Sequence, residues 1–296
     1  MHIPVLVDEV MEGLAIAAHD VVLDCTVGGA GHSVALCQRL GAAGRFIGLD
    51  KDAAALRQAA QRLTELPCPS MLIQADFRHL ERVLDEVGVA SVSKILLDLG
   101  LSSDQLEHSG RGFSFQRDEP LLMTFRDTIT AHDLTAWQIV NAWSEAALAE
   151  LIFSYGEERW ARRIARAIVR ARAQRPIDTT RALVTVIGQG VRQVRRGQKI
   201  HPATRTFQAL RMAVNDELEA LQEGLATGFT RLTPGGRMAV ISFHSLEDRT
   251  VKLFFRNAQM QQSAALYTKK PIIPSARERQ ENPRARSAKL RILVKR

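Results

Sequence analysis

The residues best suited to chemistry form a glycine-rich loop near the amino terminus. Asp24 ends a short apolar run, Val21–Asp24, and glycines follow at positions 28, 29 and 31. Glycine lets a chain turn sharply and approach a ligand closely. An apolar pattern at helical spacing begins after Ser33, so the loop leads into a helix whose first N–H groups can face a ligand. Strand, glycine loop and helix in this order predict the nucleotide-type cofactor site of a doubly wound α/β protein.

The residues around this loop indicate S-adenosylmethionine as the cofactor. A dinucleotide-binding loop needs glycine or alanine where Val34 stands, and the sequence has no G-x-x-x-x-G-K-[ST] motif for phosphates. Asp24 repels phosphate and favours a cationic or amine-bearing ligand. Asp50 ends the next apolar run, where a carboxylate can accept hydrogen bonds from ribose hydroxyls. Two alternatives stay open: a strand–helix turn with glycines used only for geometry, and a nicotinamide-dependent oxidoreductase, which Val34 disfavours.

Three further side chains are candidates for binding or catalysis. Asp98 ends a central apolar run and is our candidate catalytic residue, a proton acceptor, with the cofactor's methionyl end as its alternative ligand. His244 is a second candidate acceptor, and a helix N-cap or core histidine is its alternative role. Phe77 follows another strand and is placed to stack on an adenine, although a core phenylalanine is the commoner role.

The elements that must position these residues alternate between strand and helix. Five apolar runs indicate parallel strands, at Val21–Asp24, Arg45–Asp50, Met71–Ala75, Lys94–Leu99 and Arg237–Phe243. Asp52 is an expected N-cap of a helix that reaches about Leu63. The segment 233–236 is an expected tight turn, and the alternating pattern of 289–295 predicts an edge strand.

After Ser103 the alternation stops for about a hundred residues. Helices are expected at Ser144–Phe153, Glu157–Gln174 and Thr206–Leu232. We therefore expect a sheet domain in two parts, 1–104 and 204–296, with a helical insert at 105–203. The helix at 157–174 has a basic face beside an apolar stripe; the basic face is formed by Arg159, Arg163, Arg166 and Arg170.

The charge is distributed unevenly along the chain. The whole sequence carries a net charge of +8, but Tyr155–Arg205 has 13 basic and 3 acidic residues, and Lys269–Arg296 has 10 basic and 2 acidic residues. The remainder has 17 basic and 27 acidic residues. An acidic body with a basic insert and a basic tail predicts a polyanionic partner. The alternative interpretation is that these charged faces are simply solvated. The rival function is that of an RNA-binding or assembly protein without catalytic activity.

Composition is that of an ordinary globular protein, with 46% hydrophobic and 24% charged residues. The sequence contains no run long enough to span a membrane and no signal-like amino terminus. Its three cysteines form no C-x-x-C pair, so neither a disulfide framework nor a metal site is expected. We expect a cytoplasmic protein; a homodimer is compatible with these features.

The motifs taken in order resemble the family of small-subunit ribosomal RNA cytosine-N4 methyltransferases (RsmH, also called MraW). The resemblance covers nearly the whole chain, and the order of the motifs makes it highly specific. The motifs lie at His2–Leu6, Asp24–Ser33, Asp98–Leu106, Arg111–Phe115, Tyr155–Arg159, His201–Ala209, Ser242–Arg249 and Glu281–Ser287.

This resemblance implies a class I (Rossmann-like) methyltransferase fold with a helical domain inserted after the fourth strand. It implies methyl transfer from S-adenosyl-L-methionine to the N4 amine of a cytidine in the decoding region of 16S ribosomal RNA. The implied partner is small-subunit RNA, with no DNA, membrane or metal. Carried over by position, the cofactor contacts are Ala30, Gly31, His32, Asp50, Phe77, Asp98 and Gln105.

The chain departs from the family pattern at two places. Ala30 stands where members usually have a third consecutive glycine. The family's Pro-Leu-Asp-Met-Arg-Met is replaced by residues 120–125, in which Leu122 and Thr124 take the places of the acid and the base. This chain therefore cannot use that acid–base pair for whatever role the pair has in other members.

Overall fold

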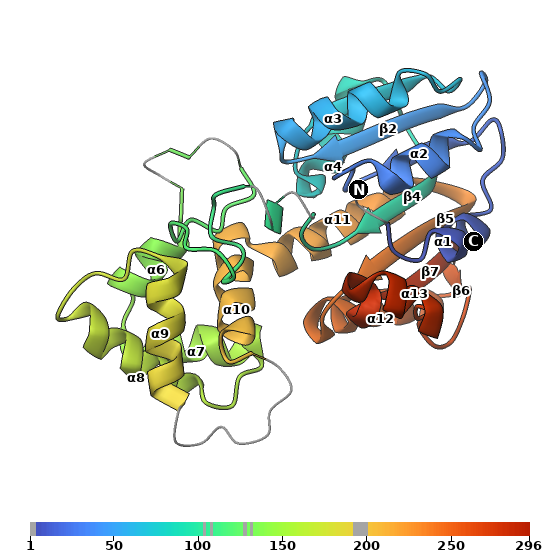
Figure 1. The fold of residues 1–296 in the computed structure, drawn as a ribbon. Helices are drawn as coiled ribbons and strands as arrows, with labels where there is room; N and C mark the ends of the chain where they lie inside the picture. The colour runs from blue at the N-terminus through green and yellow to red at the C-terminus, as the bar shows by residue number, and fades with distance from the viewer. Residues whose placement is uncertain (1–3, 103–104, 107–108, 127–128, 131–132, 192–200) are drawn as a thin grey trace. The chain divides into compact units, whose positions relative to one another are not determined.

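The computed structural model describes residues 4–102, 105–106, 109–126, 129–130, 133–191 and 201–296. The chain forms two compact units (Figure 1). One combines Met1–Gly100 with Leu218–Arg296, and the other is Leu101–Glu217. Some residues of the family motifs and of the basic segment Tyr155–Arg205 lie outside the described residues, namely His2, Ser103 and residues 192–200.

The first unit is built on a seven-stranded sheet in the order β3-β2-β1-β4-β5-β7-β6. The strands β1 to β5 are parallel, while β7 is antiparallel to both β5 and β6. The strands are β1 (Val21–Asp24), β2 (Arg45–Asp50), β3 (Ser70–Gln74), β4 (Val92–Asp98), β5 (Leu232–Ser242), β6 (Ala264–Leu266) and β7 (Lys289–Lys295). The class I methyltransferase sheet is confirmed, and the reversal of strand order between β1 and β4 marks the edge where such sheets bind ligands.

Both faces of the sheet are covered because its central strands are apolar on each side. On β4, Ile95 and Leu97 pack into one core and Leu96 into the other. The first core also receives side chains from α4 (Leu80–Glu86), α11 (Glu217–Arg231) and α12 (Ser245–Met260). The second receives side chains from α1 (Val7–Leu14) and α2 (Gly31–Cys37).

The remaining helices of this unit follow local capping rules. The Asp52 carboxylate accepts a hydrogen bond from the Ala54 N–H at 2.9 Å, which confirms it as the N-cap of α3 (Ala53–Leu63). The other elements are η1 (Phe77–His79), α13 (Ala276–Glu281) and η2 (Pro283–Ser287).

Two expectations about the end of the sheet are corrected. The strand at 289–295 is not at the edge, because the three-residue strand β6 pairs with its outer side. The segment 233–236 lies within β5, where the register against β4 shifts, and Gly235 has a φ of +76°. A turn-like sequence is thus accommodated as an irregularity in a strand.

The second unit is helical and has its own core. Its helices are α6 (Ala136–Ala142), α7 (Glu145–Gly156), α8 (Ala161–Arg172), α9 (Thr180–Val191) and α10 (Ala203–Asn215). The helix predicted at Glu157–Gln174 is shorter than expected: Glu157 is the C-cap of α7 at a φ of 47°, and α8 begins only at Ala161. The helix predicted at Thr206–Leu232 is divided, because Asp216 separates α10 from α11 at a φ of 51°. Left-handed residues other than glycine are rare and therefore hard to anticipate.

No helix among the described residues is both long enough and apolar enough to cross a membrane.

Candidate functional site

The carboxyl edge of the parallel strands carries three carboxylates. Asp24, Asp50 and Asp98 end β1, β2 and β4, which are neighbours in the sheet. Parallel pairing brings their ends to the same edge, on either side of the point where the strand order reverses. The edge is therefore an anionic site suited to a cationic or amine-bearing ligand rather than to a pyrophosphate.

Asp24 stabilises the glycine-rich loop through hydrogen bonds of its buried side chain. Its side chain is fully buried, and its oxygens accept hydrogen bonds from the Ser33 hydroxyl at 2.7 Å and the Thr26 N–H at 3.0 Å. Burial raises the pKa of Asp24 to about 6, against the opposing effect of these two hydrogen bonds. Its carboxylate thus joins the start of the loop to the helix that follows.

The loop itself is held in an unusual conformation. Ala30 is buried at a φ of 59° and forms the N-cap position of α2. This left-handed conformation costs an alanine about 1 kcal/mol, which explains the family's preference for glycine there. A Cβ on Gly31 would lie 2.9 Å from Pro4. Gly31 is therefore needed because the amino-terminal segment lies directly against the loop.

Asp50 links β2 to the same loop. Its two oxygens accept hydrogen bonds from the N–H groups of Asp52 and Gly28, each at 2.8 Å. Burial raises the pKa of Asp50, and the two backbone hydrogen bonds oppose that effect. Each carboxylate oxygen can accept a second hydrogen bond, so Asp50 retains acceptor capacity for a ligand.

His32 and Asp98 form an ion pair that sequence analysis did not anticipate. The Nδ1 atom of His32 lies 3.3 Å from Asp98 Oδ2, and its Nε2 lies 2.9 Å from the Val5 carbonyl oxygen. Because both acceptors require an N–H donor, this arrangement favours the doubly protonated imidazolium. Burial lowers the pKa of His32, but the Asp98 carboxylate outweighs burial and raises it above its usual value.

The two carboxylate oxygens of Asp98 differ in their surroundings. Its backbone N–H donates to Thr26 Oγ1 at 2.6 Å, which fixes the strand end against the loop. Its Oδ1 is buried and has no hydrogen-bond partner within the described part of the chain. An unsatisfied buried acceptor is costly, so this oxygen is a site for a donor from a ligand.

Phe77 lies just past β3 in η1 and is half-buried. One face packs against α11, where a Cβ on Gly224 would lie 2.6 Å from the ring. The Lys51 ammonium lies 5.8 Å from the ring centroid and 2.8 Å from Asp76. The ring therefore contributes to the core, and stacking on an adenine stays a prediction.

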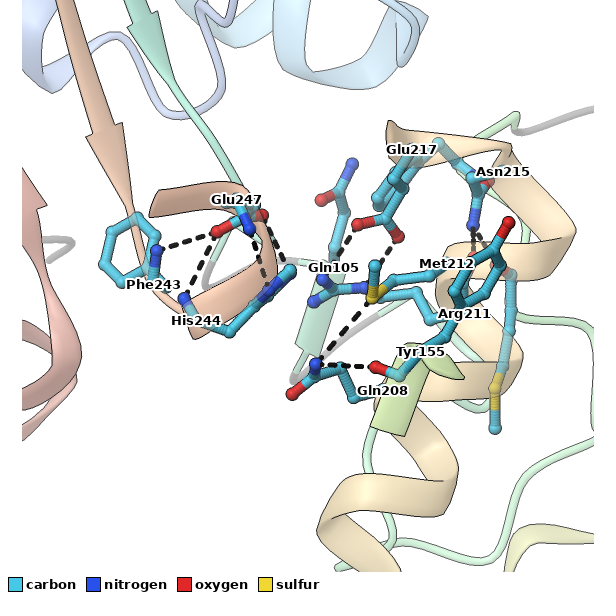
Figure 2. A network of polar contacts seen from close by, with 12 residues as sticks. Gln105, Tyr155, Gln208, Arg211, Met212, Asn215, Glu217, Phe243, His244 and Glu247 are labelled. Carbon is cyan, nitrogen blue, oxygen red and sulfur yellow. Dashed lines mark hydrogen bonds and ion pairs between the residues drawn. The ribbon is translucent and has the colours of Figure 1, made fainter. Parts of the chain in front are cut away.

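Gln105 belongs to the helical unit. Its side chain is buried, and its Oε1 accepts a hydrogen bond from the Ser102 N–H at 3.0 Å. Figure 2 shows it together with Arg211, whose Nε lies 2.7 Å from Glu217 Oε1. Its cofactor role likewise stays a prediction.

His244 caps a helix, which was the alternative to its role as a candidate proton acceptor. The imidazole accepts a hydrogen bond from the Glu247 N–H at 3.4 Å, and the Glu247 carboxylate accepts from the His244 N–H at 3.3 Å (Figure 2). This reciprocal pair is a capping box at the start of α12.

Two motifs of the helical unit meet each other. The Gln208 side-chain amide donates to the Tyr155 carbonyl oxygen at 3.0 Å (Figure 2). A Cβ on Gly156 would lie 2.6 Å from the Arg205 carbonyl oxygen. These motif residues therefore serve the packing of α7 on α10, and close backbone approach explains the glycine.

The segment that lacks the family's acid and base is held by other contacts. Met123 is buried at a φ of 56°. Asn215 donates to the Met123 carbonyl oxygen at 2.7 Å and accepts from the Phe125 N–H at 2.8 Å. Arg111 donates to the Phe125 carbonyl oxygen at 2.7 Å. An ion pair at 122 and 124 is thus not required for this segment to be ordered.

The four arginines predicted to form a basic helix face are exposed; Arg163, Arg166 and Arg170 lie on α8, whereas Arg159 precedes it. The guanidinium groups of Arg159 and Arg163 lie 4.9 and 5.4 Å from the Trp160 ring centroid. Arg166 pairs with Glu145 at 3.3 Å, whereas Arg170 has no acidic partner among the described residues. The opposite face, with Ile164 and Ile168, is fully buried.

The model of the MraW methylase family matches residues 1–296. A ribosomal RNA small subunit methyltransferase H from Symbiobacterium thermophilum is 45% identical over 309 aligned residues, which cover 99% of this chain and 96% of the relative. The protein of the same description from Heliobacterium modesticaldum is 44% identical, with 99% and 98% covered. A crystal structure of a candidate rRNA methylase from Clostridium thermocellum aligns over 100% of both chains with a TM-score of 0.50 and 13% identity; this likeness supports the fold.

Proposed function

The chain belongs to the MraW methylase family, and from this premise we propose that it methylates small-subunit ribosomal RNA with S-adenosylmethionine as methyl donor. The proposed acceptor is the exocyclic N4 amine of a cytidine in the decoding region. Membership of a methylase family excludes the nicotinamide-dependent alternative. The proposed substrate is found in the cytoplasm, and neither DNA nor a membrane takes part.

The residues at the sheet edge fit this cofactor. The observation that carries the fit is the Asp50 carboxylate at the end of β2: its oxygens accept backbone hydrogen bonds from Gly28 and Asp52 at 2.8 Å and keep capacity to accept ribose hydroxyls. Three strand-end carboxylates suit a ligand with a cationic centre and hydroxyl donors, and they oppose a pyrophosphate. When bound, S-adenosylmethionine supplies a methyl group already activated by the sulfonium charge.

In our proposal each residue of the site has a separate task. Asp50 accepts hydrogen bonds from the ribose hydroxyls while it holds Gly28 in place through the 2.8 Å bond. Ala30, Gly31 and His32 form the loop that lines the cofactor. Phe77 is proposed to stack on the adenine, and Gln105 is the remaining proposed cofactor contact.

Asp98 is the proposed catalytic residue. Cytosine N4 is a poor nucleophile because its lone pair is delocalised into the ring. Methylation forms the N–CH₃ bond, breaks the S–CH₃ bond and leaves the amine with one surplus proton. We assign Asp98 Oδ1 as the acceptor that orients the amine and takes this proton, while His32 at 3.3 Å holds the other oxygen. Positioning supplies much of the remaining rate enhancement.

The exposed arginines of α8 and the basic tail are proposed to bind RNA phosphates. Arg170 has no acidic partner within the described residues, and Arg159 and Arg163 expose charge beside an aromatic ring. Such surfaces suit a folded polyanion better than a free nucleoside. We therefore expect assembled or nearly assembled small subunits to be the substrate, with little methylation of short unstructured RNA.

A transfer assay tests the proposal. Purified protein, radiolabelled S-adenosylmethionine and small subunits from cells lacking this protein should yield labelled N4-methylcytidine after nuclease digestion. Efficient transfer to a short single-stranded oligonucleotide would contradict the proposed substrate. Label in any other nucleoside would contradict the proposed reaction.

A further inference from the structure

A basic pocket lies in the first unit beside the end of β5. It has a volume of about 300 Å³, and its lining includes Phe243, His244, Arg279, Arg286, Ser287 and Lys289. The residues come from the start of α12, from α13, from η2 and from β7. Pockets of this size accommodate small ligands or part of a larger one.

The pocket carries uncompensated positive charge. Arg279 and Arg286 are exposed, and neither has an acidic partner within the described parts of the chain. Asp248 neutralises the Lys289 that lines the pocket, at 2.9 Å, and also binds Arg291 at 2.7 Å. Glu247 accepts a hydrogen bond from the Phe243 N–H at 2.8 Å. Two free guanidinium groups in a pocket favour a phosphate, which they can bind in a bidentate manner.

In the sheet, this pocket and the cofactor loop lie on opposite sides of β4, the strand that ends at Asp98. The glycine loop and Asp50 follow β1 and β2, on one side of β4, whereas β5 and β7 lie on its other side. Asp98 pairs in register with Ile241 of β5, two residues before Phe243. A Cβ on Gly100 would lie 3.4 Å from the Phe243 ring, so the pocket begins where the catalytic strand ends.

We propose that Arg279 and Arg286 bind a backbone phosphate of the RNA strand that presents the target cytidine. This inference rests on the proposed function. With the cofactor on the β1–β2 side and a phosphate on the β5–β7 side, the base between them reaches Asp98. The pocket thereby positions the nucleotide, and Arg279 and Arg286 are positioning residues.

The experiment compares the double variant Arg279→Gln/Arg286→Gln with Arg277→Gln. Arg277 lies on the same helix as Arg279, but outside the pocket and paired with Glu281 at 2.8 Å. Small subunits from cells lacking the protein serve as the probe. The double variant should raise the KM for subunits roughly ten- to a hundred-fold. It should also reduce the salt slope of RNA binding by about 0.7 per phosphate lost.

Two further measurements keep the inference falsifiable. Calorimetry should give the wild-type affinity for S-adenosylmethionine; a parallel loss would assign the pocket to the cofactor's carboxylate and overturn the inference. Arg286→Lys should have a KM for subunits between those of the wild type and the double variant, because it retains the charge and loses the bidentate contact; a KM as high as that of the double variant would contradict binding through charge. A double variant indistinguishable from Arg277→Gln in KM and salt slope would also overturn it. Failure of the wild-type protein to methylate subunits would instead count against the proposed function, and the salt slope would still report on the pocket.

Discussion

Replacing Asp98 with asparagine keeps the shape of the side chain and removes its charge. In the structure Asp98 Oδ2 lies 3.3 Å from His32 Nδ1, and the buried Oδ1 has no hydrogen-bond partner among the described residues. The backbone N–H of Asp98 still donates to Thr26 Oγ1 at 2.6 Å, so the loop should keep its conformation. The variant therefore alters the proposed acceptor with little change in geometry.

The size of the effect distinguishes the two roles open to Asp98. A positioned proton acceptor typically contributes about 10²–10⁴-fold in rate, so kcat should fall by that factor while the affinity for S-adenosylmethionine changes little. If Asp98 instead holds the ammonium group of the cofactor, losing a charged hydrogen bond of about 1.5–3 kcal/mol weakens cofactor binding roughly ten- to a hundred-fold. Single-turnover transfer to small subunits and calorimetry with the cofactor measure the two quantities separately.

The same variant has a predicted pH signature. The pKa of His32 is raised above 6.5 in the folded protein, so its ion pair stabilises the fold fully below that pH and ceases to do so as pH rises through the raised value. Asp98→Asn should therefore be more destabilising at mildly acidic than at alkaline pH in thermal melts. A variant that transfers methyl groups at the wild-type rate, or one whose whole defect lies in cofactor affinity, would refute the catalytic assignment.

Three other changes test the remaining parts of the account. Asp24→Asn should abolish the loss of stability that ionisation of Asp24 causes as the pH rises from 3.8 to about 6, measured by chemical denaturation over that pH range; an unchanged pH profile would contradict this. Asp50→Ala should weaken S-adenosylmethionine binding roughly ten- to a hundred-fold, and unchanged affinity in a folded variant would remove Asp50 from the site. Charge reversal at Arg163 and Arg170 should weaken RNA binding and flatten its salt dependence without altering cofactor affinity; an unaltered salt slope would leave these arginines as a solvated face.

Local signals made much of the sheet unit predictable. β1 and β2 have the bounds expected from their apolar runs, because parallel central strands are apolar on both faces. Asp52 could be recognised as an N-cap because capping depends on neighbouring residues. The alternation in β7 predicted a strand but not its neighbour, since β6 has only three residues and no pattern of its own.

The remainder depends on contacts between distant residues. The pairing of His32 with Asp98 and the approach of Pro4 to Gly31 arise only when the sheet edge is assembled. The helix breaks at Glu157 and Asp216 use left-handed conformations for residues that ordinarily continue a helix or cap one. The pocket lined by Arg279 and Arg286 likewise forms only where four elements meet. The number of basic residues along the sequence therefore indicated a basic tail but could not predict the pocket.

The central claim is methyl transfer to cytidine N4 in small-subunit RNA, and mass mapping of that RNA tests it most directly. RNA is compared from cells with the protein, without it, and with Asp98→Asn in its place. We expect one base-methylated cytidine in the decoding region that is present only with the wild-type protein. An identical map in all three strains, or a protein-dependent methyl group on a ribose or on another base, would contradict the account.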